Sequence, residues 1–327
     1  MPPLESLERL ADSFAALERP TERKRMLVIV NPYATTVSGR LKNLVVSALQ
    51  GRYEVDAIDT ESRGHATELC REAAQEGYDV VVAFGGDGTV NEAANGLMHS
   101  PTPLTCLPGG ATNVFCRMLG IPGDIVDATE HLLRVADDWQ PRSVDLGHVN
   151  GRAFTFAGGM GLDASVVRRV DEHPRLKASL KQWYFGFAAV TTFTKNYVIR
   201  PPRLETHVGD QVVRGVTVVF QNGGLYSYFG RRPLQVAEDV SLDDGTIAGA
   251  VLERATPIDI PTVMARLLSP KLRLVDHRRV TGFTTPEDFR VVSSDGRPVP
   301  IQVDGDYIGE ATDATFGVWP GALRVVA

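Results

Sequence analysis

The sequence predicts an α/β domain followed by a domain built mostly of antiparallel strands. Up to about residue 144, short apolar β-branched runs alternate with segments of helical periodicity. That alternation is typical of a doubly wound parallel sheet with helices on both faces. From residue 145 onward, short β-rich segments recur between turn residues, which favours an antiparallel β-sandwich. A chain of 327 residues is long enough for two such domains.

The first domain is expected to contain four parallel strands, each followed by a helix. The strands are predicted at residues 26–30, 53–58, 79–83 and 103–107, and the helices at 41–49, 64–77, 92–98 and 113–119. Apolar residues at helical spacing predict a further amphipathic helix at 4–17. We therefore divide the chain into an N-terminal extension (1–24), the α/β domain (25–144) and the β-rich domain (145–327), whose last strand can return to the first domain.

The second domain is expected to contain six short strands and two helices. The strands are predicted at 153–157, 203–208, 215–221, 246–251, 289–292 and 301–303. One helix, at 175–194, carries the aromatic segment 183–187. The other, at 258–268, precedes the basic residues Lys271 and Arg273.

Composition limits the classes of partner. A net charge of −6 gives no general attraction to nucleic acid or to anionic membranes, so any membrane contact needs a local patch. No apolar stretch approaches the roughly 20 residues needed to cross a bilayer, and the N-terminus does not resemble a signal peptide. Three unpatterned cysteines favour reduced thiols. We expect a cytoplasmic protein.

The run Gly85-Gly86-Asp87-Gly88-Thr89-Val90-Asn91-Glu92 is the most informative motif. It joins a buried strand to a helix, so it lies at the carboxyl edge of the sheet, where ligands bind in open α/β folds. Glycines allow a tight turn, and a helix N-terminus offers amide donors to a phosphate. Asp87 argues for a metal that accompanies the phosphate. A surface turn would also explain Gly-Gly-Asp-Gly, but it explains this position less well.

This run resembles the nucleotide-binding motif of the diacylglycerol kinase catalytic-domain family, which includes bacterial diacylglycerol kinases, sphingosine kinases and ceramide kinases. NAD kinases share the Gly-Gly-Asp-Gly-Thr core. Two further segments match, Asn31-Pro32 after the first strand and Pro108-Gly109-Gly110-Ala111-Thr112-Asn113 after the fourth. The second departs from the family pattern, because Ala111 stands where Thr is usual. The resemblance extends from about Arg25 to the C-terminus.

The resemblance implies a nucleotide site built from four loops at one sheet edge. Its implied contacts are Asn31, Pro32, Thr35, Thr60, Gly85, Gly86, Gly88, Thr89, Asn91, Glu92, Gly110, Thr112 and Asn113. Asp87 would hold the catalytic Mg²⁺ or position the phosphates.

Three acidic sites in the second predicted domain also match the family. Asp145 would lie near the lipid head group. In the segment 239–246, a structural Mg²⁺ would be held by the Asp244 side chain and the carbonyl oxygens of Ser241 and Thr246; a solvated hairpin turn is the alternative. The segment Val303-Asp304-Gly305-Asp306 resembles Val-Asp-Gly-Glu, which supplies the acid that activates the lipid hydroxyl. Asp306 replaces the usual Glu, and the sequence does not decide between Asp304 and Asp306 as the base.

We therefore expect an ATP- and Mg²⁺-dependent lipid kinase acting on diacylglycerol or a related lipid. The alternatives are an NAD kinase and a nucleotide-binding regulator without catalysis. The expected partner is a lipid substrate at the membrane surface, contacted peripherally, with no nucleic acid; a homodimer is compatible with the sequence. Candidate membrane-contacting residues are the aromatic segment 183–187 and the basic group Arg266, Lys271, Arg273, Arg278 and Arg279.

Overall fold

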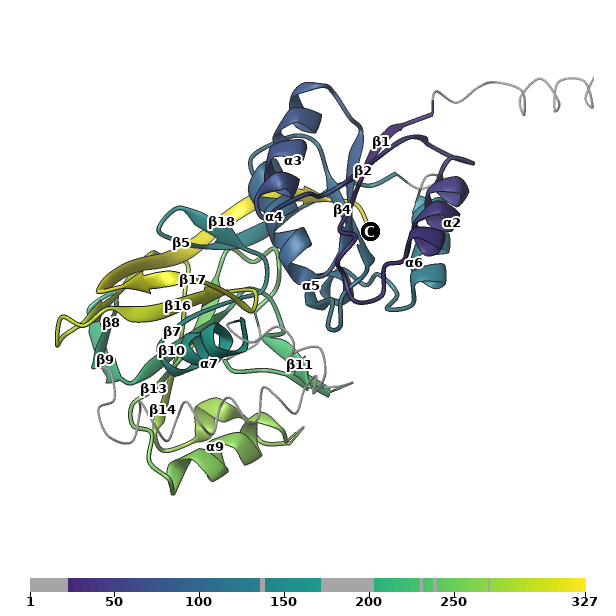
Figure 1. The fold of residues 1–327 in the computed structure, drawn as a ribbon. Helices are drawn as coiled ribbons and strands as arrows, with labels where there is room; N and C mark the ends of the chain where they lie inside the picture. Colours follow the sequence, from purple (N-terminus) through teal and green to yellow (C-terminus); the bar gives the residue numbers. More distant parts are fainter. Residues whose placement is uncertain (1–22, 136–138, 172–202, 230–231, 238–239, 270) are drawn as a thin grey trace, which may run out of the picture.

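The computed structural model describes residues 23–135, 139–171, 203–229, 232–237, 240–269 and 271–327 (Figure 1). The helices expected at 4–17 and at 175–194, including the aromatic segment 183–187, lie outside the described residues.

The N-terminal domain contains a parallel sheet between two layers of helices. Its strands lie in the order β2-β1-β3-β4. They are β1 (Arg25–Val30), β2 (Glu54–Asp59), β3 (Val80–Gly85) and β4 (Leu104–Pro108). The helices α2 (Gly39–Leu49) and α6 (Ile125–Val135) cover one face, and α3 (His65–Gln75) and α4 (Asp87–Leu97) cover the other (Figure 1). The central strand β3 is buried along its whole length, as a parallel strand covered on both faces should be. A short helix, α5 (Val114–Met118), follows β4.

The C-terminal domain is a sandwich of two sheets. One is a six-stranded antiparallel sheet in the order β14-β13-β10-β7-β16-β17. Its strands are β7 (Ala157–Met160), β10 (Thr217–Gln221), β13 (Ile247–Leu252), β14 (Val280–Thr285), β16 (Val299–Val303) and β17 (Asp306–Ala311). The strands facing it are β5 (Arg142–Val149), β6 (Arg152–Phe154), β8 (Leu204–Val208), β9 (Gln211–Gly215), β15 (Phe289–Ser293) and β18 (Asp313–Val325). Phe220, Phe289 and Phe316 pack between the sheets with ring centroids 4.4–5.8 Å apart.

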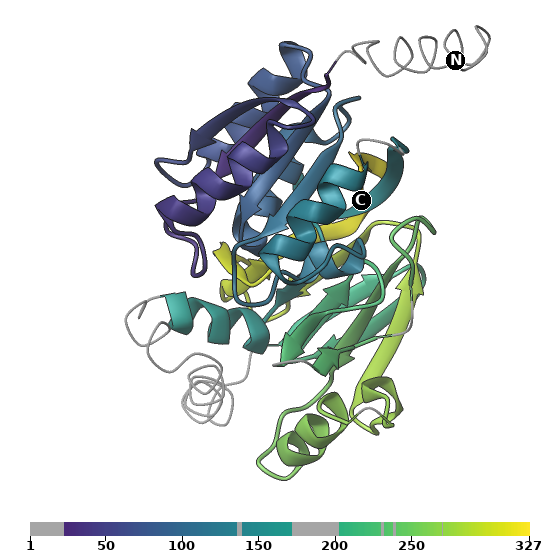
Figure 2. The ribbon, with the colours of Figure 1, turned by 90° about the vertical axis from the view of Figure 1, so that its right-hand side faces the viewer.

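The 13-residue strand β18 joins the two domains. It pairs antiparallel with β5 and β15 in the sandwich, and its end pairs parallel with β4 at Val325 and Leu104. The parallel sheet and one layer of the sandwich are therefore parts of a single ten-stranded sheet, along which β18 runs from one domain into the other (Figure 2).

The remaining elements lie around the sandwich. The helix α7 (Leu162–Asp171) contacts β16 and β17. The strands β11 (Ser227–Phe229) and β12 (Arg232–Leu234) form a separate hairpin, and α9 (Asp259–Leu267) is followed by the 3₁₀ turn η2 (Leu274–Asp276). None of the helices in the described ranges is both long and apolar enough to span a bilayer.

The predicted fold class, a parallel α/β domain followed by an antiparallel β-sandwich, is confirmed. Two local features differ from the prediction. The helix expected from residue 92 begins at Asp87, so most of the glycine-rich run is the first turn of α4. The strand β5, which contains Asp145, was not among the predicted strands.

Candidate active site

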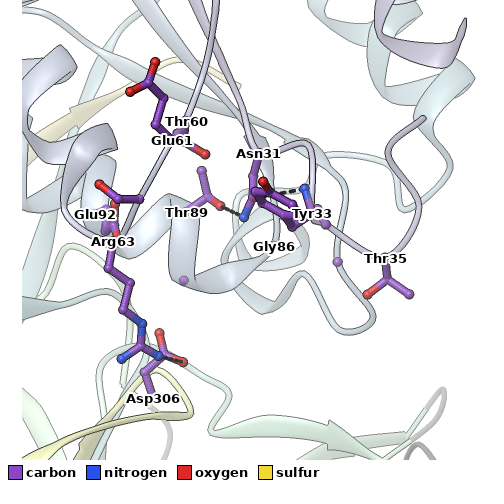
Figure 3. Close-up of a pocket in the computed structure, with 14 residues that line it drawn as sticks. Asn31, Tyr33, Thr35, Thr60, Glu61, Arg63, Gly86, Thr89, Glu92 and Asp306 are labelled. Carbon is purple, nitrogen blue, oxygen red and sulfur yellow. Dashed lines mark hydrogen bonds and ion pairs between the residues drawn. The ribbon is translucent and has the colours of Figure 1, made fainter. Parts of the chain in front are cut away.

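A pocket of about 370 Å³ opens at the carboxyl edge of the parallel sheet (Figure 3). It is formed by the loops that follow β1, β2 and β4, by the first turns of α4, and by the start of β17 from the other domain. The lining residues are Asn31, Tyr33, Ala34, Thr35, Thr60, Glu61, Ser62, Arg63, Gly86, Gly88, Thr89, Glu92, Gly110 and Asp306. The four loops that the sequence placed at one sheet edge thus line a single pocket, which lies between the domains.

Asn31 connects the first loop to α4. Its side-chain amide donates to Thr89 Oγ1 at 3.1 Å, and its Oδ1 accepts from the Tyr33 backbone at 3.0 Å (Figure 3). The Asn31 backbone amide in turn donates to the carbonyl of Phe84 at the end of β3. Asn31 and Thr89 both line the pocket, and the hydrogen bond between them fixes the position of each side chain.

The third and fourth loops touch backbone to backbone, which requires glycine. A Cβ atom on Gly110 would lie 2.7 Å from the Gly86 Cα, and one on Gly109 would lie 2.9 Å from the Gly85 Cα. Asn113, in the left-handed region at φ +49°, holds this approach, because its side chain accepts from the Gly110 amide at 2.8 Å and donates to the Gly110 carbonyl at 2.9 Å. Asn113 thus shapes the pocket without lining it.

Asp87 and Thr112 contact each other rather than the pocket. Thr112 Oγ1 donates to Asp87 Oδ2 at 2.8 Å, and the Val114 amide at the start of α5 donates to Asp87 Oδ1 at 2.7 Å. Burial raises the pKa of Asp87 to about 6, against the lowering effect of the Thr112 hydrogen bond. Protein donors thus bond both carboxylate oxygens of Asp87 in this structure. That Asp87 holds the catalytic Mg²⁺ or positions the phosphates, and that Thr112 contacts the nucleotide, stay predictions.

Asp304 is a buried structural carboxylate. Its oxygens accept hydrogen bonds from the Asn91 side chain, the Thr155 amide and hydroxyl, and the amides of Phe156 and Ala157, at 2.7–3.0 Å. Burial raises its pKa, whereas the surrounding donors lower it. Of the two candidate bases, Asp304 is therefore enclosed by protein donors, and Asp306 is the one that lines the pocket. Asn91, expected to contact the nucleotide, serves as one of these donors.

Asp306 is the acidic residue of the C-terminal domain that lines the pocket. It follows a tight turn in which Asp304 and Gly305 have φ values of +50° and +81°. Its Oδ2 lies so close to Gly88 that a Cβ there would approach it to 2.9 Å, and its Oδ1 lies 4.0 Å from the Arg63 guanidinium. Figure 3 shows Arg63 extending from the β2 loop toward Asp306. The two domains therefore meet at the pocket through Gly88, Arg63 and Asp306.

Two predicted acidic sites lie outside the pocket. Asp145 is buried, and its oxygens accept from the amides of Gly245 and Gly321 at 2.7 Å each, so it holds the junction of three segments. Its place near the lipid head group stays a prediction. Asp244 accepts from the amides of Ser241 and Thr246 at 2.6 and 2.9 Å, which orders the turn that contains it. In the described part of the chain, no three His, Cys, Asp or Glu side chains are grouped to hold a metal.

Five lining residues were not among the predicted contacts: Tyr33, Ala34, Glu61, Ser62 and Arg63. Their positions in the loops that follow the first two predicted strands could have indicated that they line the pocket. Five of the predicted contacts do not line the pocket: Pro32, Gly85, Asn91, Thr112 and Asn113. Gly85 must nevertheless remain small, because its Cβ would lie 2.5 Å from Thr89 Oγ1.

The lining combines the groups that phosphoryl transfer needs. Gly86 and Gly88 stand at the N-terminus of α4, where amide donors and the helix dipole favour a phosphate. Arg63 is the one cationic side chain among the fourteen lining residues, and Glu61, Glu92 and Asp306 supply carboxylates. A polyphosphate with a divalent cation, and a hydroxyl to be deprotonated, both suit this pocket.

Comparison with known proteins gives matches along nearly the whole chain. Residues 25–149 match the family model described as the diacylglycerol kinase catalytic domain, and residues 157–327 match the YegS C-terminal NAD kinase beta sandwich-like domain. A diacylglycerol kinase of Bacillus subtilis is 29% identical over 298 residues, which cover 88% of this chain and 91% of that protein. One of Staphylococcus haemolyticus is 28% identical over 302 residues, covering 88% and 84%.

A solved structure shares the fold. The crystal structure of a diacylglycerol kinase from Bacillus anthracis aligns with a TM-score of 0.69 at 20% sequence identity, covering 94% of this chain and 97% of the other. At this identity the likeness bears on the fold alone, and it extends over both domains.

Proposed function

The chain belongs to the lipid kinase family that carries the diacylglycerol kinase catalytic domain and uses ATP, and we propose that it transfers the γ-phosphate of ATP to the free hydroxyl of diacylglycerol or a closely related lipid. One observation supports the assignment of roles above all others. A carboxylate of the C-terminal domain, Asp306, faces the glycine-rich start of α4 across the pocket.

In the proposed mechanism, the phosphates of ATP bind at the N-terminus of α4, and the lipid hydroxyl approaches from the side of Asp306. The hydroxyl oxygen attacks the γ-phosphorus as its proton passes to the Asp306 carboxylate. The bond between the γ-phosphorus and the β,γ-bridging oxygen breaks, and ADP leaves. Arg63 would stabilise negative charge on the transferring group, since positioning and charge neutralisation account for most of the catalysis in such reactions.

We extend the proposal to a Mg²⁺ ion bound with ATP. Glu61 and Glu92 line the pocket with carboxylate oxygens, which are the ligand type that Mg²⁺ prefers. Mg²⁺ in kinase sites is usually held by one or two carboxylates together with substrate phosphates, so these residues fit it. When bound, the ion would neutralise charge on the β- and γ-phosphates.

A kinase assay against a lipid panel tests the proposal. Purified protein would be incubated with labelled ATP and Mg²⁺ and with mixed micelles of diacylglycerol, sphingosine or ceramide, and in parallel with NAD. We expect phosphatidic acid from diacylglycerol as the main product. Labelled NADP would instead assign an NAD kinase, and nucleotide binding with no phosphorylated product would contradict the proposed catalysis.

A further inference from the structure

The helix α9 has two apolar sides, although a helix on a protein surface ordinarily has one. Its inner side carries Ile260, Val263 and Leu267, which pack on the buried cluster beneath it. That packing attaches the helix to the sandwich.

The outer side of α9 is apolar and exposed. Ile258 is 77% exposed and Met264 41% exposed, and Leu272, just beyond the helix, is 49% exposed. Pro261 and Ala265, which a helix places on the same side as Ile258, are exposed as well. Apolar residues gathered in this way on a surface mark an interaction site more often than isolated ones do.

Basic residues lie close to this apolar surface in the sequence. Six Lys or Arg and three Asp or Glu occupy residues 253–279, in a chain whose net charge is −6. Of the three acidic residues, Asp259 is buried and paired with Arg278 at 3.1 Å, and Glu253 accepts from the Thr281 hydroxyl. Asp276 is exposed. Arg266 bonds the Arg273 carbonyl, and Lys271 and Arg273 are exposed.

We propose that this surface docks on an anionic lipid bilayer. The α9 patch is defined here as Ile258, Met264, Leu272, Arg266, Lys271 and Arg273. Exposed apolar side chains with exposed cations beside them in the chain match the two layers of such a membrane, the anionic head groups and the hydrocarbon below them. The choice of a bilayer as the partner rests on the proposed function, because diacylglycerol resides in one.

The position of the α9 patch makes this testable apart from catalysis. In both views, α9 lies at the end of the C-terminal domain remote from the parallel sheet (Figures 1 and 2). None of its residues lines the pocket. Substitutions in the patch should therefore change membrane binding while leaving the pocket intact.

The experiment is co-sedimentation with phosphatidylcholine vesicles prepared with and without phosphatidylglycerol. Two double variants separate the two contributions. Ile258→Ser with Leu272→Ser removes apolar side chains of the patch, and Lys271→Glu with Arg273→Glu reverses its charge. Matched controls are Val126→Ser on α6 and Arg71→Glu on α3, both exposed on the other domain. We expect the wild-type protein to bind anionic vesicles in a salt-sensitive way, and each double variant to bind at least about tenfold more weakly, whereas the controls bind like wild type.

Turnover supplies the second readout. Activity on a short-chain, water-dissolved diacylglycerol should match wild type in both double variants, and activity on vesicle-embedded diacylglycerol should fall. Vesicle binding that neither double variant weakens would overturn the proposal, as would equal losses in the controls. If wild type is a dimer and the double variants are monomers, the α9 patch is an interface with a second copy of the chain, which would overturn the proposal. Patch-dependent vesicle binding without any lipid phosphorylation would support the docking surface and contradict only the proposed function.

Discussion

Asp304 and Asp306 are two positions apart, yet they differ in every physical property that matters for proton transfer. Asp304 is buried among five protein donors, whereas the Asp306 side chain is 34% exposed and lines the pocket. A general base must be able to accept a proton from substrate, and only Asp306 has that access. Sequence alone could not separate them, because burial depends on the turn between β16 and β17 and on the loop of residues 155–157 that packs against it.

The first prediction concerns this pair. Asp306→Asn should lower kcat by about 10²–10⁴-fold with ATP affinity within a few-fold of wild type, because the base acts in the transition state. Asp304→Asn should instead lower the free energy of unfolding by roughly 2–4 kcal/mol, since an amide group faces backbone donors that need an acceptor. Steady-state kinetics and urea denaturation measure the two effects. Comparable kcat losses, with unchanged stability in both variants, would reverse the assignment.

Asp306→Glu is the matched control for the first variant. It keeps the carboxylate and restores the residue usual in the family. We expect it to retain most of the activity that Asp306→Asn loses. A Glu variant as inactive as the Asn variant would show that Asp306 acts through its exact size, not through its charge.

The second prediction concerns Asp87 and pH. Its pKa is raised to about 6 in the folded protein, from an ordinary value of 3.8, chiefly by burial. The folded state therefore holds this proton more tightly than the unfolded state. The contribution of Asp87 to the free energy of unfolding is then largest below pH 4 and decreases as the pH rises to 6.

Asp87→Asn should remove that decrease and leave the variant at least as stable as wild type at pH 7.5. Its turnover should nevertheless fall, because the contacts with Thr112 and Val114 position the loop after β4 next to the phosphate-binding glycines. Urea denaturation between pH 4 and 8 and a kinase assay measure the two effects. If the stability of wild type and variant depends on pH in the same way across this range, the predicted pKa effect is contradicted. Full kinase activity in the variant would contradict the predicted role of Asp87 in positioning the loop.

At the scale of single elements, the loops of the pocket depend on close backbone approach. The sequence predicted the glycine-rich turns from their position after buried strands, but the contact between Gly86 and Gly110 joins two loops distant in the chain. Only the assembled sheet brings them together.

The third prediction follows from that contact. Gly110→Ala should lower kcat/KM for ATP by roughly tenfold or more and destabilise the fold by about 1–3 kcal/mol, because its Cβ meets backbone that cannot rotate away. Gly123→Ala is the control, since its Cβ meets nothing within 4 Å. Equal effects of the two substitutions, or none in Gly110→Ala, would show that the loops can separate without loss.

The fourth prediction concerns the turn at residues 241–246. Asp244 bonds two amides of this turn, so Asp244→Ala should lower Tm by a few degrees even without metal. If the turn also holds a structural Mg²⁺, the wild-type Tm should rise with Mg²⁺, and the variant Tm should not respond to it. Thermal melts of both proteins with Mg²⁺ and with chelator decide this. A wild-type Tm indifferent to chelator removes the metal from the turn.

Strands and helices were predicted correctly where the local sequence pattern determines them. Prediction failed where pairing with a strand distant in the chain determines the structure. The four parallel strands were each predicted within two residues at either end, because their apolar runs are continuous. The strand β18 was not predicted, since Pro320 and Gly321 interrupt its pattern. In the structure, these residues form an irregularity between Trp319 and Leu323, and Asp145 fixes it through the Gly321 amide.

At the scale of the whole molecule, β18 connects the domain that carries the phosphate-binding glycines to the domain that carries Asp306. Phe316 packs in the sandwich core, while Leu323 and Val325 pack in the core of the α/β domain. The pocket requires residues from both domains, so the relative position of Asp306 and Gly88 depends on this shared strand. Sequence patterning found the two domains and allowed the last strand to return to the first, but it could not locate the pairing, which joins residues more than 200 positions apart, Val325 and Leu104.

The last prediction tests that coupling. Many chains of this length unfold domain by domain, whereas a shared strand should make the two domains unfold together. Calorimetry should show one transition with equal calorimetric and van 't Hoff enthalpies, and ATP with Mg²⁺ should shift all of it upward. Leu323→Ala, at a fully buried site in β18, should lower the free energy of unfolding by about 2–5 kcal/mol. It should also speed amide exchange in β10 and β13 of the other sheet, unlike the exposed control Val212→Ala. Two separate transitions, only one of them shifted by ATP, would mean that β18 joins the domains in space without coupling their stability.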